Sequence, residues 1–61
     1  IMTLEEARLS NNWSLEDASL AFGLDVETII QYESGTETPN KWALDLILDI
    51  LELDYNDIVF N

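Results

Sequence analysis

The chain has 61 residues, 48% of them hydrophobic, which suits one small domain with a single core. It contains no cysteine and no histidine, which excludes disulfides, thiolate metal sites and histidine-based acid–base catalysis. Thirteen acidic residues against two basic ones give a net charge of −11, whereas a DNA-binding protein neutralises phosphates with Lys and Arg.

The first stretch with a helical pattern covers about residues 3–11. Thr3 is the expected N-cap, and Glu6 stands three positions later, where its side chain can complete a capping box. The apolar positions of this helix are Leu4, Ala7 and Leu9.

A second helix is predicted over residues 15–22, with Ser14 as its N-cap. Gly23 is expected to end this helix, because glycine takes the left-handed conformation at little steric cost. The expected inward positions are Ala18, Ala21 and Phe22.

A third helix is predicted over residues 26–33, between a cap at Asp25 and a closing glycine at Gly35. Since an α-helix has about 3.6 residues per turn, Ile29 and Tyr32 are expected to face inward. The outer face then carries Val26, Glu27, Ile30 and Gln31.

A fourth helix is predicted over residues 41–51, and it carries two apolar stripes. The stripe expected in the core is Leu44, Ile47, Leu48 and Leu51. The second stripe is Trp42, Leu46, Ile50 and Leu53. We expect the second stripe either to be covered within the chain or to form a homodimer or partner contact through Trp42, Leu46 and Ile50.

The end of the chain is expected to form a short fifth helix over residues 54–58 that covers part of the second stripe. The whole pattern predicts one all-α domain over residues 1–61, a compact bundle of four to five short helices with a central helix-turn-helix. The sequence has neither a membrane-spanning apolar run nor the pattern of a signal peptide, so we expect a soluble cytoplasmic protein.

Residues 14–35 resemble the helix-turn-helix of phage repressor and Cro-like proteins, the lambda-repressor-like DNA-binding domains. The shared pattern is a Ser or Thr cap, a short helix, a glycine with an apolar residue, and a capped recognition helix that ends in Glu before a small residue and a glycine. Here these places hold Ser14, Gly23 with Leu24, Asp25, Glu33, and Ser34 with Gly35. The resemblance implies a phage or prophage origin in a bacterial host cell.

The resemblance also implies an ion pair between Arg8 and Glu33. In such proteins an arginine of the first helix pairs with the glutamate near the end of the recognition helix, and these two residues occupy those places. The alternative is that Arg8 is a solvated surface residue. If the pair forms, one of only two basic residues is engaged in structure.

Positions that contact DNA in the resembling family are poorly matched. The second helix begins with Leu15, where the family commonly has Gln, and the loop before the fourth helix lacks the usual Lys or Arg until Lys41. Direct readout of bases favours Arg, Lys, Asn and Gln, and on the outer face of the third helix only Gln31 is of that kind.

We therefore predict an antirepressor-like regulator that binds a basic DNA-binding repressor and blocks that partner's access to DNA, with little or no DNA binding of its own. Acidic side chains would meet the partner's cations, and aliphatic ones would form a desolvated centre. The expected partner-binding residues are Glu16, Asp17, Val26, Glu27, Ile30, Gln31 and Glu37.

Two other functions stay open. A conventional Cro-type or repressor-type regulator would contact DNA through Thr28, Gln31, Thr36, Thr38 and Lys41. An antitoxin-like dimerisation module is the second alternative. The acidity alone could also serve only to keep a small protein soluble.

An enzyme is not expected. The carboxylates are spread over predicted surfaces, and no cluster pairs one of them with a base, a nucleophile or a second metal ligand. We accordingly expect no catalytic residues, no cofactor and no metal site.

Overall fold

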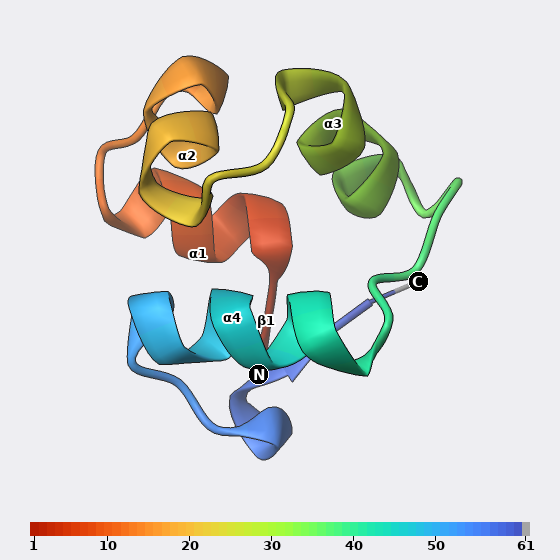
Figure 1. Ribbon diagram of the computed structural model, residues 1–61. Coiled ribbons are helices and arrows are strands. Elements are labelled where there is room, and N and C mark those ends of the chain that lie inside the picture. Colours follow the sequence, from red (N-terminus) through yellow and green to blue (C-terminus); the bar gives the residue numbers. More distant parts are fainter. Residues whose placement is uncertain (61) are drawn as a thin grey trace.

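The computed structural model of the chain describes residues 1–60 as a small helical bundle with a minimal strand pair (Figure 1). In chain order its elements are β1 (Met2–Thr3), α1 (Leu4–Ser10), α2 (Leu15–Phe22), α3 (Val26–Ser34), α4 (Lys41–Leu51), the 3₁₀ turn η1 (Tyr55–Asp57) and β2 (Ile58–Val59). The predicted all-α class is correct, because four short helices form the body of the domain around a helix-turn-helix.

The four helices enclose one core. In Figure 1, α2 and α3 lie side by side above, α4 lies across the lower part, and α1 is seen between them. Trp13 covers the junction of α1 and α2, where its ring packs edge-on against Phe22 with 5.8 Å between the ring centroids. Leu9, expected as an apolar position of α1, is exposed instead. The buried hydrophobic residues are Leu4, Ala7, Ala18, Phe22, Ile29, Ala43, Ile47, Leu48 and Ile58.

Capping boxes set the N-termini of α1 and α2, and glycines set the C-termini of α2 and α3. Thr3 and Ser14 each begin a helix with a complete capping box, in which the hydroxyl accepts from the third residue and that residue's carboxylate accepts from the cap's N–H. Gly23 and Gly35 follow α2 and α3 in the left-handed conformation, with φ of 69° and 82°. Asp25 stands at the N-cap of α3, but its side chain makes no capping hydrogen bond, which corrects the expectation for this residue.

Helix α4 is buried differently from the predicted pair of stripes. Ala43, Ile47 and Leu48 are buried, whereas Leu44 and Leu51 are half-buried against the core. The predicted second stripe does not act as a unit. Ile50 and Leu53 also pack against the core, while Leu46 is half-buried and Trp42 is 70% exposed.

The predicted fifth helix over residues 54–58 is wrong. Tyr55–Asp57 makes one 3₁₀ turn, and the chain then extends as β2, which pairs in parallel with β1 so that Met2 faces Ile58 and Thr3 faces Val59. The β-branched Ile58 and Val59 favour the extended form, and the Ile58 side chain is buried in the core. Within residues 1–60, the structure contains no helix long and apolar enough to cross a membrane.

Replacing Gly23 by alanine tests the turn between α2 and α3. The Gly23→Ala variant should lose about 1–2 kcal/mol of unfolding free energy, because a residue with a Cβ is strained at this positive φ. The added Cβ would meet no atom within 4 Å, so no clash adds to the strain. Urea unfolding followed by circular dichroism measures the loss, and Gly23→Asn should lose less because Asn tolerates this conformation. An alanine variant as stable as the parent would contradict the left-handed turn.

Candidate interaction surface

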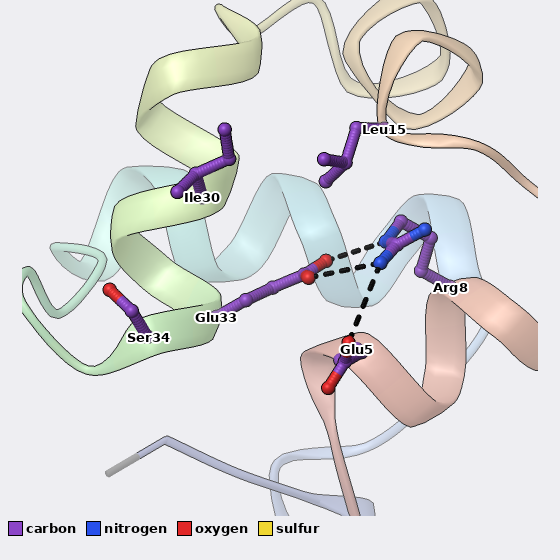
Figure 2. A pocket seen from close by; sticks show the side chains of 6 residues that line it. All are labelled: Glu5, Arg8, Leu15, Ile30, Glu33 and Ser34. Carbon is purple, nitrogen blue, oxygen red and sulfur yellow. Dashed lines mark hydrogen bonds and ion pairs between the residues drawn. The ribbon is translucent and has the colours of Figure 1, made fainter.

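Arg8 and Glu33 form an ion pair between α1 and α3, as the resemblance implies (Figure 2). The Nε of Arg8 lies 2.7 Å from Oε2 of Glu33, and Nη2 lies 3.1 Å from Oε1. The two side chains are only 9% and 11% exposed. Two parallel N–H···O bonds in a dehydrated setting make this a directional contact, which fixes the distance between the two helices.

The Arg8 guanidinium makes two further contacts. Its Nη1 donates to the backbone carbonyl of Trp13 over 2.9 Å, and Nη2 lies 3.9 Å from a carboxylate oxygen of Glu5. The hydrogen bonds that Arg8 donates to Glu33 raise the pKa of Arg8, and this outweighs the opposite effect of burial. Arg8 is therefore a charged part of the framework, and it is not presented to a ligand.

Lys41, the other basic residue, is paired on the surface of α4. Its Nζ lies 2.7 Å from Oδ2 of Asp45, one helical turn later, and the hydroxyl of Tyr55 donates to the other oxygen of that carboxylate. The Lys41 side chain is 83% exposed, so this pair is weak and solvent-screened. Both basic side chains of the chain thus have a carboxylate partner within it.

The outer face of α3 is mixed in chemistry. Glu27 is exposed and Ile30 is 41% exposed, whereas Val26, Thr28 and Gln31 are half-buried. The backbone carbonyl of Gln31 accepts the N–H of Glu37 over 3.2 Å, which holds the following loop against the end of α3. The face therefore offers an acid and an aliphatic side chain more openly than its single amide.

The remaining predicted contact residues lie at the start of α2 and in the loop before α4. Glu16 and Asp17 are exposed in the first turn of α2, but the Asp17 carboxylate already accepts the Ser14 N–H over 3.0 Å. In the loop, Thr36, Glu37 and Thr38 are exposed. Asp17 is partly committed to capping, so Glu16 and Glu37 are the more available charges.

A shallow hollow of about 460 Å³ opens between α1, α2 and α3 beside the Arg8–Glu33 pair (Figure 2). Leu15 and Ile30 lie on one side of the hollow, and the ion pair with Glu5 lies on the other. Its lining residues are Glu5, Arg8, Leu15, Ile30, Glu33 and Ser34. Of these, only Ile30 was predicted as a contact residue, and Arg8 and Glu33 were predicted as an ion pair. Glu5, Leu15 and Ser34 were assigned no role, because only the packing of three helices brings them together.

The sequence profile of the helix-turn-helix family matches residues 4–58, which is nearly the whole chain. The chain belongs to the helix-turn-helix family. No curated protein and no solved structure matches it significantly. The family consists of DNA-binding transcription regulators and is not a family of enzymes.

This member of the helix-turn-helix family combines the expected framework with a net charge of −11. The caps, the turn glycine and the Arg8–Glu33 pair hold α2 and α3 in place. The exposed surface of these two helices carries Glu16, Asp17 and Glu27 but no basic residue. A polyanion that approached this surface would meet like charge.

Removing one partner of the buried pair should be costly. An Arg8→Met variant should lose about 3 kcal/mol of unfolding free energy, because it leaves the Glu33 carboxylate dehydrated and unpaired. Urea unfolding of Arg8→Met and of the double variant Arg8→Met/Glu33→Leu provides the comparison. The double variant should recover much of the loss, since two apolar side chains need no partner. Equal stabilities of the parent and Arg8→Met would show that the pair does not hold the helices.

The Tyr55 hydroxyl should affect the titration of Asp45. The pKa of Asp45 is lowered from its ordinary 3.8, first by the hydrogen bond from Lys41 and then by the one from Tyr55. A carboxyl with a lowered folded pKa contributes stability above its unfolded pKa, and that contribution is lost as the pH falls through the folded pKa. Tyr55→Phe should therefore raise the pKa of Asp45 toward 3.8, as measured by carboxyl ¹³C NMR. Lys41→Gln should raise it further, and an unchanged pKa in Tyr55→Phe would contradict the contact.

Proposed function

We propose that this helix-turn-helix protein is an antirepressor-like transcription regulator, which binds a basic DNA-binding repressor and blocks that repressor's access to DNA. The supporting observation is electrostatic. The net charge is −11, and both basic side chains are already paired with carboxylates of the same chain. A bacterial cytoplasm, with a phage or prophage origin, is the setting that this role implies.

DNA binding by this surface would lack its usual source of affinity. Contacts between Lys or Arg and phosphates supply most of the non-specific affinity of DNA-binding proteins. Arg8 is buried in its pair, and Lys41 would have to leave Asp45. At about 0.1 M salt the Debye length is about 10 Å, so the carboxylates of α2 and α3 still repel a duplex in contact with them.

A basic protein would find the same surface complementary. Glu16, Glu27 and Glu37 are exposed and can face the cations with which a repressor holds phosphates. Ile30, with Val26 beside it on α3, supplies apolar surface at the centre, where contact residues contribute most to affinity. The partner would lose its phosphate-binding groups on association.

A Cro-type DNA-binding regulator is the second candidate, and family membership favours it. The Lys41–Asp45 pair is exposed, so its release costs little and would supply one phosphate contact. The other contacts would come from Thr28, Gln31, Thr36 and Thr38. An antitoxin-like dimerisation module would instead use the 70% exposed Trp42, with Leu46 and Ile50 at its edge.

DNA titration separates the first two functions. At low salt, where electrostatic binding is strongest, the protein should not bind a labelled random duplex at concentrations up to about 100 µM, the weak end of typical non-specific binding. Fluorescence anisotropy measures this, with a basic helix-turn-helix repressor as a positive control. Micromolar or tighter binding would overturn the protein-contact proposal and favour the Cro-type regulator.

Competition tests the antirepressor role directly. A basic DNA-binding protein that copurifies with the chain should lose its operator complex in a gel-shift assay when the chain is added. Glu27→Lys and Ile30→Asp should each abolish this effect while the circular dichroism spectrum stays unchanged. Asp49→Lys, which makes the same charge change at an exposed position of α4, is the matched control and should retain the effect. Full activity of both α3 variants would exclude the α3 surface as the interface.

A further inference from the structure

The lining of the hollow between α1, α2 and α3 contains both apolar side chains and carboxylates (Figure 2). Leu15 comes from the first turn of α2 and is half-buried against the core, so its position is fixed by packing. Ile30, on α3, lies on the same side of the hollow as Leu15 and is 41% exposed (Figure 2). These two side chains form an aliphatic wall that is open to solvent on one side.

The charges of the hollow leave one carboxylate in excess. Its lining contains Glu5, Glu33 and Arg8. Both oxygens of Glu33 are engaged by Arg8, at 2.7 and 3.1 Å. Glu5 has a side chain that is 61% exposed, and its contact with Arg8 is long, at 3.9 Å. The Glu5 carboxylate therefore retains most of its capacity to accept hydrogen bonds from a ligand.

We infer that this hollow receives an arginine side chain of a partner protein, an inference that rests on the proposed protein-binding function. The methylene stem of the arginine lies along Leu15 and Ile30, and its guanidinium donates to Glu5. Ser34 lies at the edge of the hollow, but its hydroxyl already donates to the Gln31 carbonyl and is bonded to Thr36, so it takes no part in holding the arginine.

Arginine fits this lining better than other side chains. An aliphatic side chain would dehydrate the Glu5 carboxylate without replacing its hydrogen bonds, and an acidic one would add a like charge. Lysine carries a compact, strongly hydrated ammonium, whereas a guanidinium is weakly hydrated, planar and able to bind a carboxylate with two N–H groups. The apolar wall beside a single accessible carboxylate favours the weakly hydrated cation.

Short blocked peptides can test the hollow without knowledge of the partner. The probes are acetyl-Ala-Arg-Ala-amide and its lysine counterpart, titrated into ¹⁵N-labelled protein at 0.1 M salt. The arginine peptide should shift the amide signals of residues that line the hollow, and it should bind about threefold or more tightly than the lysine peptide. The lysine peptide has the same charge, so it reports general attraction to an acidic protein.

Two variants and one control localise the binding. Glu5→Gln should weaken the arginine peptide about threefold to fivefold, as expected for one exposed charge contact. Ile30→Ala should weaken it about threefold through lost apolar contact. Glu37→Gln removes the same charge from the loop outside the hollow and should leave the affinity unchanged.

Several results would overturn the inference. These are equal affinity for the two peptides, shifts spread over the whole acidic surface, the same affinity in Glu5→Gln as in the parent, or no binding. A failure here is distinct from a failure of the proposed function. If Glu27→Lys abolishes the competition for the operator complex while Glu5→Gln does not affect it, the protein-contact function stands and the arginine site is wrong.

Discussion

The bidentate contact between Arg8 and Glu33 is the interaction on which the arrangement of this domain depends. It joins α1 to the end of α3, and the bond from the same guanidinium to the Trp13 carbonyl also fixes the link between α1 and α2. One side chain thus positions three helices. Buried pairs contribute little net stability, so we assign this one a geometric role, because its two parallel N–H···O bonds orient α3 relative to α1.

The same contact has an electrostatic consequence. The chain has two basic residues. Arg8 is buried in its pair with Glu33, and Lys41 is paired with Asp45 on α4. The helix-turn-helix geometry is therefore retained while the surface that would face a nucleic acid presents carboxylates. Fold and surface charge are separate properties, and a fold permits several functions. The charge pattern of this surface is the observation from which we propose protein binding.

Most of the fold could be predicted from local sequence signals. The part that depends on pairing between distant segments could not. The capping boxes at Thr3 and Ser14 depend on residues three apart, so the sequence shows them directly. Strand β2 depends on a partner at the other end of the chain, and a helical prediction for that segment was wrong. The outer face of α3 followed from helical periodicity. The hollow did not, because Glu5 and Leu15 approach Ile30 only after three helices pack.

The parallel pairing of β1 with β2 joins two segments that are 56 positions apart (58 − 2), which makes nearly the whole chain one closed loop. Closing a long loop costs conformational entropy. Pairing two short strands offsets this cost only when the helices are already packed, because packing has then brought the two segments close together. This ladder should therefore form late in folding and open first under native conditions, as the weakest cooperative unit. Since Ile58 belongs to the core and Thr3 caps α1, each opening would also loosen the start of the helix that carries Arg8.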